Sequence, residues 1–106
     1  MTYQDFTRLI GGARDCETEE QYIAEAGGSV PADDIDEVLR ILHYCWAYAQ
    51  DPTPSTIRSL TGLSQVAFAR EYNIPRRTIE NWDSGTNAAP GYVSDLLAFA
   101  VINTEK

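Results

Sequence analysis

The chain has 106 residues, of which 43% are hydrophobic, and it carries a formal net charge of −8. This length suits one domain, or one small domain with an appendage, and the apolar fraction is large enough for a core. The negative charge argues at first sight against a nucleic-acid-binding protein, and no apolar run approaches the length of a membrane span. The polar start, which includes Asp5, is unlike a signal peptide, so we expect a cytoplasmic protein.

The charge is divided unevenly along the chain. Residues 1–52 contain eleven acidic and three basic side chains, which gives −8, whereas residues 53–106 contain five of each, which gives zero. The sequence therefore predicts an acidic helical segment over 1–52, suited to dimerisation or partner binding, and a separate unit over 53–106. Acidic clusters usually form a solvated face; the sharper alternatives are a surface that repels DNA or one that binds a basic partner.

Three helices are predicted in the acidic half. The first covers residues 2–11 and is expected to stop at Gly11 and Gly12. The second covers residues 17–26, with Thr18 suited to its N-terminus. The third runs from residue 31 to about residue 50 and has a wide apolar face. That face consists of Ile35, Val38, Leu39, Ile41, Leu42, Cys45, Trp46 and Tyr48. Such a face belongs to the core of a small bundle, to a homodimer seam, or to both.

Side chains that carry catalysis or hold metals form no recognisable cluster. Cys16 and Cys45 lack the spacing of metal ligands, and we expect two free thiols rather than a disulfide. His43 is the only histidine, which excludes a site built from several histidines. The order of residues suggests neither a Ser/His/Asp arrangement nor a Gly-rich phosphate loop. The sequence therefore predicts no enzyme, no cofactor and no metal site.

Pro52 and Pro54 mark a linker, because two prolines disfavour helix on both sides of the break. A helix is then predicted from residue 54 to about residue 60, with Ile57 and Leu60 inward. Two short helices follow, over about 64–72 and 75–84. Ser64 is the N-cap candidate of the first of these two helices.

The turn between these two short helices is marked by its residues. Asn73 stands where the backbone must turn left-handed, and Pro75 suits the first turn of a new helix. Gly85 closes the second helix. Ile79 and Trp82, three residues apart, form its buried side. The residues left facing out are Arg76, Arg77, Thr78, Glu80 and Asn81.

This stretch resembles the helix-turn-helix of the Cro/phage-repressor (XRE) family. The family pattern is Leu-(Ser/Thr)-Gln, a small Ala, a Gly-type turn, a β-branched anchor and an aromatic-acidic-x-Gly ending. The matching residues are Leu63-Ser64-Gln65, Ala69, Asn73, Ile79 and Trp82-Asp83-Ser84-Gly85. Asn73 replaces the usual Gly, and Asp83 replaces Glu. The resemblance covers about residues 55–101 and implies an all-α, lambda-repressor-like helix-turn-helix bundle, here preceded by the acidic helical segment.

The resemblance also implies sequence-specific binding of double-stranded DNA by the second short helix. Arg76 and Arg77 begin that helix, and an arginine fork matches the O6 and N7 atoms of guanine. The family clamps a phosphate at the position of Gln65. The loop over 86–90 has no Lys or Arg, but its polar groups suit phosphate. The residues expected to contact DNA are Gln65, Arg76, Arg77, Thr78, Asn81, Thr86 and Asn87.

Arg58 and Asp83 fall where the family pairs a basic residue of the first helix with the acidic residue that ends the recognition helix. We expect a partly buried, bidentate ion pair that braces the recognition helix. A contact between Arg58 and DNA is the alternative.

One helix-turn-helix with so few basic residues binds weakly alone, so we expect a homodimer on a palindromic site. The dimer is held by the N-terminal helices, by the last predicted helix over 91–102, or by both. The apolar residues of that last helix pack inward or against a second subunit: Tyr92, Val93, Leu96, Leu97, Ala100 and Val101. The expected function is that of a prokaryotic or phage transcriptional regulator. The alternative is a protein-interaction module, an antitoxin or an acidic inhibitor, that uses the N-terminal half.

Overall fold

Seven α-helices and one 3₁₀ turn make up the part of the chain that the computed structural model describes, residues 1–104. No residue of that part lies in a strand, so the prediction of an all-α fold is confirmed. The elements are α1 (Tyr3–Arg14), α2 (Glu19–Ala26), η1 (Gly27–Ser29), α3 (Ile35–Gln50), α4 (Pro54–Thr61), α5 (Gln65–Glu71), α6 (Arg76–Ser84) and α7 (Gly91–Thr104).

Local sequence signals set most of the helix ends. At five helices the side chain of the N-cap residue accepts a backbone N–H bond, which satisfies a donor that the helix itself leaves unpaired. These N-cap residues are Thr2, Thr18, Asp34, Thr53 and Ser64. Gly62 and Gly85 end α4 and α6 at φ angles of 73° and 78°, in the left-handed region that glycine tolerates best.

Gly11 and Gly12 do not stop the first helix, so that prediction was wrong. α1 continues through both glycines to Arg14. Its last turn is held by packing: Ala13 is fully buried, and a Cβ at Gly12 would lie 3.7 Å from the ring of Tyr22 in α2. Tertiary contacts here outweigh the low helix propensity of glycine. α2 and α3 begin later than predicted, at Glu19 and Ile35, because the caps lie directly before those residues.

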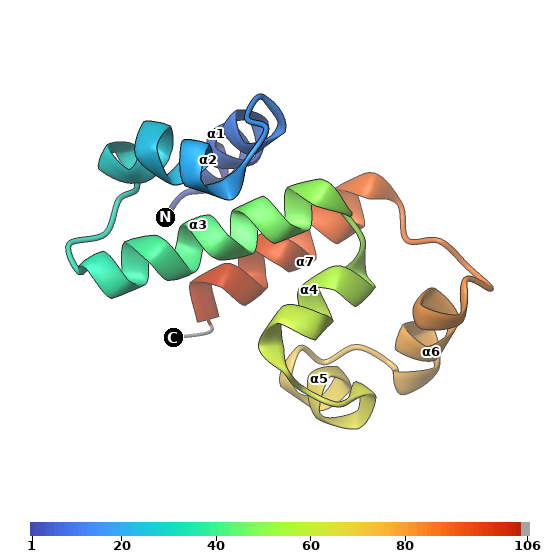
Figure 1. The fold of residues 1–106 in the computed structure, drawn as a ribbon. Helices are drawn as coiled ribbons and strands as arrows, with labels where there is room; N and C mark the ends of the chain where they lie inside the picture. Colours follow the sequence, from blue (N-terminus) through green and yellow to red (C-terminus); the bar gives the residue numbers. More distant parts are fainter. Residues whose placement is uncertain (105–106) are drawn as a thin grey trace.

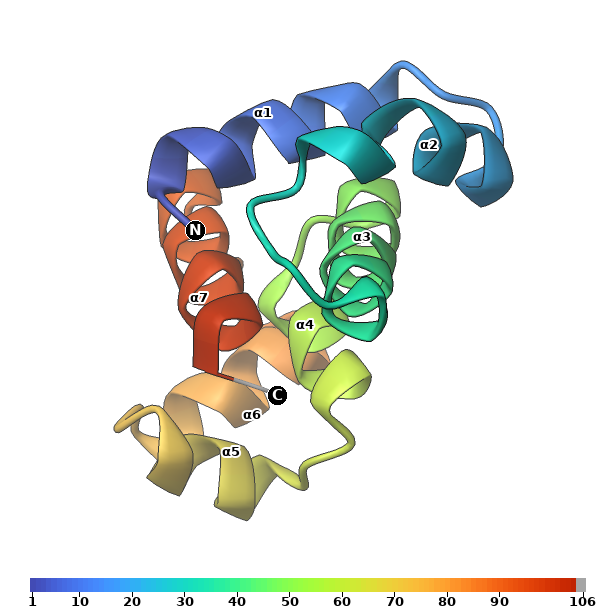
Figure 2. The ribbon, with the colours of Figure 1, turned by 90° about the vertical axis from the view of Figure 1, so that its left-hand side faces the viewer.

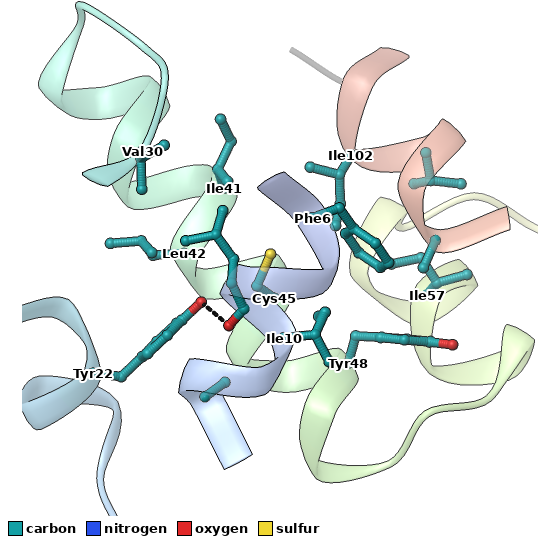
Figure 3. Packing of buried hydrophobic residues seen from close by; sticks show 14 of the residues in the cluster. Phe6, Ile10, Tyr22, Val30, Ile41, Leu42, Cys45, Tyr48, Ile57 and Ile102 are labelled. Carbon is teal, nitrogen blue, oxygen red and sulfur yellow. Dashed lines mark hydrogen bonds between the residues drawn. The ribbon is translucent and has the colours of Figure 1, made fainter. Parts of the chain in front are cut away.

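The central helix is α3. α7 lies beside it, and α1 crosses both helices at one end of the molecule, as two views show (Figures 1 and 2). Phe6 of α1 lies among the buried side chains together with Ile57 of α4 and Ile102 of α7 (Figure 3). Residues on both sides of position 52 therefore belong to one hydrophobic cluster. The linker that the prolines predict is the short connection between α3 and α4.

Two buried tyrosines tie this core together through their hydroxyl groups. Tyr22 donates a hydrogen bond to the Leu9 carbonyl oxygen at 2.7 Å, drawn as the dashed line in Figure 3. Tyr48 of α3 bonds to the Ser94 hydroxyl at 2.8 Å and to the Asp95 carboxylate at 2.6 Å, both in α7. Burial costs little when a polar group keeps its partners, so these bonds fix how α2 and α7 dock.

Both cysteines are free thiols, as expected. Cys45 is fully buried in the core, and burial raises the pKa of its thiol to about 12. Cys16 lies at the surface between α1 and α2, where its thiol is 3.3 Å from the Glu25 carboxylate. Burial and that carboxylate raise the pKa of Cys16.

Part of each predicted apolar face is left uncovered. Ile35 and Leu39 of α3 are 66% and 40% exposed, and Tyr92 and Leu96 of α7 are 69% and 52% exposed. An inward position for Tyr92 and Leu96 is therefore wrong, because they lie on the side of α7 that faces solvent. Contact with a second subunit, the other alternative, stays a prediction for these residues.

One shared core predicts one cooperative unfolding transition. Trp46 of α3 and Trp82 of α6 report on the two ends of the molecule, so Trp46→Phe and Trp82→Phe variants each leave one reporter. We expect their fluorescence-detected urea midpoints to coincide. We expect Phe6→Ala to lower the free energy of unfolding by about 3–5 kcal/mol in both signals, because Phe6 is buried to 1% exposure. A shift confined to the Trp46 signal would contradict the single core.

Candidate nucleic-acid interface

α5 and α6 form two short helices joined by a tight turn. Asn73 occupies the turn with a φ of 53°, the left-handed conformation that the sequence predicts there. The Ile74 N–H donates to the Ala69 carbonyl oxygen at 2.9 Å, which closes the turn. Ala69 is 8% exposed where the chain folds back, so a small side chain fits this position. Pro75 precedes α6 and sets its first turn.

α6 turns one side to the core and the other to solvent. Ile79 is 2% exposed and anchors the helix, while Trp82 is partly buried against the core cluster. Arg76 and Arg77 are exposed at the N-terminal end of the helix. Asn81 lies four residues beyond Arg77, on the same face of the helix, and is partly exposed.

The C-terminal end of α6 is fixed by the carboxylate of Asp83. Arg58 of α4 donates from Nη2 to Asp83 Oδ2 at 2.8 Å, and Gln65 of α5 donates from Nε2 to the same oxygen at 2.7 Å. The Ser55 hydroxyl of α4 donates to Oδ1. One side chain thus joins three helices. We call this group, Ser55, Arg58, Gln65 and Asp83, the Asp83 brace.

The ion pair expected from the sequence is present, but it is not bidentate. Arg58 and Asp83 have side chains that are 23% and 17% exposed, so the pair is partly buried. Nη1 of Arg58 donates instead to the Leu63 carbonyl oxygen at 3.1 Å, and Oδ1 of Asp83 accepts from Ser55. Arg58 therefore also holds the turn between α4 and α5. The alternative of a DNA contact does not fit this geometry, because the guanidinium faces into the protein.

The brace changes the titration of Asp83. Burial by itself raises the pKa of this carboxyl group. The hydrogen bonds from Gln65 and Ser55 and the charge of Arg58 outweigh that effect, and the pKa falls below its ordinary value of 3.8. The carboxylate is therefore ionised at neutral pH, the form that the brace requires.

The two arginines of α6 differ in their surroundings. Nε of Arg76 lies 2.9 Å from Oε1 of Glu80, one turn along the helix, and these side chains are 62% and 44% exposed. An exposed pair of this kind is weak and opens readily. Arg77 forms no ion pair with any residue between positions 1 and 104. Two cations are thus presented at one end of α6.

The other residues expected to contact DNA lie beside or beyond α6. Thr78 is partly exposed within the first turns of the helix. Thr86 and Asn87 are exposed just after its C-terminal end, where the Asn87 N–H donates to the Asn81 carbonyl oxygen at 3.3 Å. Gln65 uses one amide N–H for Asp83 and has a second one to donate.

Sequence reasoning missed the part that Ser55 and Gln65 play in holding α6. A signal for Ser55 was present, because it lies three residues before Arg58 and therefore on the same side of α4. Gln65 was interpreted only as a phosphate contact. Its bond to an acidic residue eighteen positions later depends on how α5 and α6 cross, and no local pattern encodes that crossing.

The two ends of the molecule carry different charge. α1 and α2 lie at one end and α5 and α6 at the other (Figures 1 and 2), and the longest dimension of the molecule is 39 Å. The acidic residues of α1 and α2 therefore lie apart from the arginines of α6. Within residues 1–104 no group of three or more His, Cys, Asp or Glu side chains is placed to hold a metal ion, and no helix is long and apolar enough to cross a bilayer.

We expect Asp83→Asn to lower the free energy of unfolding by about 1–3 kcal/mol at pH 7, because the partly buried network loses its negative charge and one of its two acceptor oxygens. The folded pKa of Asp83 is lowered, so its stabilisation is complete above the ordinary value of 3.8 and is lost as pH falls through the folded pKa. The difference in free energy of unfolding between wild type and variant should therefore become smaller below about pH 4. Urea unfolding followed by circular dichroism across this range measures it.

The matched control is Glu80→Gln, which removes a carboxylate from the exposed pair on the same helix. Its effect on stability should stay below about 0.5 kcal/mol. An Asp83→Asn effect no larger than that of the control, or a difference that does not change with pH, would contradict the account of the brace.

Comparison with known proteins finds no family model, no curated protein and no solved structure that matches this chain.

Proposed function

We propose that this chain binds double-stranded DNA in a sequence-specific manner and that α6 is the helix that enters the major groove. The observation that carries the proposal is the arrangement of α6. Its C-terminal end is held by the Asp83 brace, while its N-terminal end presents Arg76 and Arg77 to solvent. The resemblance of residues 55–101 to the Cro/phage-repressor family supports the same reading.

The chemistry of the exposed face suits base edges. The major groove admits one α-helix, and an arginine side chain pairs with guanine O6 and N7 through two parallel hydrogen bonds. Asn81, on the same face as Arg77, has the amide that pairs with adenine N6 and N7. Thr78 supplies a methyl group and a hydroxyl group for a thymine or the backbone. A helix that is held rigidly loses little entropy when it enters the groove.

Phosphate contacts fix the register of such a complex. Thr86 and Asn87 are exposed directly after α6, and the second amide N–H of Gln65 is directed by its first bond to Asp83. None of these groups is charged, so the affinity of one copy rests on few ionic contacts. The acidic end of the molecule is repelled by the duplex, which favours an approach with α6 foremost.

Because one copy binds DNA weakly, we propose that the protein binds as a homodimer. Two recognition helices on a palindrome double the number of contacts. Tyr92 and Leu96 of α7 offer an exposed apolar face, and they belong to the half of the chain whose formal charge is zero. Occupancy of a promoter by such a dimer regulates transcription without chemistry. We propose this role for the protein, as a cytoplasmic regulator of the prokaryotic or phage type.

Removing the two arginines of α6 should abolish specific binding. We expect wild-type protein to bind one sequence upstream of its own gene tightly and with strong salt dependence. The Arg76→Ala/Arg77→Ala variant should bind at least about 30-fold more weakly, since each arginine–guanine pair contributes about 1–3 kcal/mol of discrimination. Fluorescence anisotropy of a labelled duplex across a salt series measures both effects.

The charge-matched control is Arg8→Ala/Arg14→Ala, which removes two arginines from α1 at the opposite end. It should retain the affinity of the wild type within about threefold. Circular dichroism establishes that each variant stays folded. The proposal that α6 contacts the bases would be refuted if the wild type did not bind DNA at low salt. It would also be refuted if the two variants lost the same amount of DNA affinity.

The dimer contact is tested separately by Tyr92→Ala/Leu96→Ala. We expect the dissociation constant of the dimer, measured by sedimentation velocity, to rise at least about tenfold, because the two side chains are the exposed anchors of α7. The control is Ile35→Ala/Leu39→Ala, the other exposed apolar pair, which should leave the dimer intact. This contact would be contradicted if the wild type were monomeric, or if the Ile35→Ala/Leu39→Ala variant were monomeric.

A further inference from the structure

Ile35 and Leu39 lie one turn apart at the start of α3 and form a second exposed apolar surface. They belong to a stripe that continues to Leu42 and Trp46 on the same side of the helix. Leu42 is fully buried, and the Trp46 ring lies 5.8 Å from the Tyr22 ring of α2. The protein thus covers the later half of the stripe and leaves the first half to solvent, with Ile35 66% exposed.

Three acidic residues flank Ile35 in the sequence. Asp33, Asp34 and Asp36 are exposed and lie within two residues of Ile35. Asp34 caps α3, so its side chain is turned to the Asp36 N–H at 3.0 Å. We call Ile35, Leu39, Asp33 and Asp36 the α3 patch.

The arginine and the histidine that follow on α3 do not offset these charges. Arg40 is held by Glu37, at 2.6 Å, and by the Ile102 carbonyl oxygen, at 2.7 Å. The His43 ring lies 2.8 Å from the Glu19 carboxylate of α2. Both groups are thus directed to other partners, and the surface at the start of α3 is apolar with an excess of negative charge.

We propose that the α3 patch docks a basic amphipathic helix from another protein. Such a helix has apolar side chains one turn apart, which cover Ile35 and Leu39, and lysine or arginine beside them, which meet Asp33 and Asp36. The apolar contact supplies affinity, and the charges supply orientation and selectivity. This proposal does not depend on DNA binding.

The negative charge of the α3 patch disfavours the other partners that could cover it. A second copy would bring the same carboxylates face to face, and DNA or an anionic lipid surface would be repelled in the same way. A neutral apolar partner would take the carboxylates out of water without offering them a cation. Tyr92 and Leu96 have one carboxylate beside them, that of Asp95, which accepts a hydrogen bond from Tyr48, and this face suits self-association instead.

The position of the patch permits two complexes at once. α3 begins at the end of the molecule far from α6 (Figure 1), so a partner on the α3 patch leaves Arg76 and Arg77 open. A partner protein held there would be carried to the site at which α6 is bound.

A synthetic peptide of about 18 residues, with leucines on one face of a helix and lysines on the other, is the probe. We expect it to bind the full chain in a salt-sensitive manner, with the largest amide shifts in the NMR spectrum of the labelled protein at residues 33–43. Ile35→Ala/Leu39→Ala should weaken binding about tenfold. Asp33→Asn/Asp36→Asn should weaken binding and flatten its salt dependence.

Three controls separate the α3 patch from general attraction to an acidic protein. Tyr92→Ala/Leu96→Ala should bind the peptide like wild type. A peptide with serine in place of leucine, at the same charge, should bind at least about tenfold more weakly. Circular dichroism checks that each variant keeps its helix content; the substituted side chains are exposed, so the fold should persist.

The proposal is overturned if the serine peptide binds as well as the leucine peptide, or if the largest shifts lie outside residues 33–43. It is also overturned if Ile35→Ala/Leu39→Ala converts a dimer to a monomer, because the occupant is then a second copy. Each of these results is independent of the DNA measurement. Failure of one proposal therefore leaves the other standing.

Discussion

The carboxylate of Asp83 is the interaction on which the position of α6 depends. It accepts hydrogen bonds from Ser55 and Arg58 of α4 and from Gln65 of α5, so a single side chain fixes the C-terminal end of α6 against two other helices. α5 and α6 have seven and nine residues, lengths at which an isolated helix is unstable in water. The buried side chain of Ile79 and the Asp83 brace together stabilise α6, which its helix propensity alone would not.

α3 connects the end of the molecule that contains α1 and α2 with the end that contains α5 and α6. It packs against α1 and α2, runs beside α7 and contacts α4, the helix that packs against α6 (Figures 1 and 2). The molecule therefore keeps its negative charge at one end and its two α6 arginines at the other, although both ends share one core. In our account this separation permits a chain of net charge −8 to approach DNA with α6 and a basic protein with the α3 patch.

The sequence predicted much of this structure because many of its signals are local. Thr18 and Ser64 as caps, Asn73 in a left-handed turn and Gly85 at a helix end are each decided by a few neighbouring atoms. The predictions were wrong where contacts between residues far apart in the sequence determine the local structure. Gly12 stays helical because Tyr22 packs over it, and the second amino group of Arg58 turns to Leu63 rather than to Asp83. Whether Tyr92 faces the core or solvent depended on how α7 lies against α3, which periodicity does not specify.

The most direct test of the account is to map which amides respond to DNA. Protein labelled with ¹⁵N is titrated with a duplex from upstream of its own gene, and shifts are followed for every assigned amide. The account predicts that the largest changes fall on residues 76–81 and 86–87, with α1 and α2 unchanged. Changes centred on α1 and α2, or none at any salt concentration, would contradict the assignment of α6 as the DNA-reading helix.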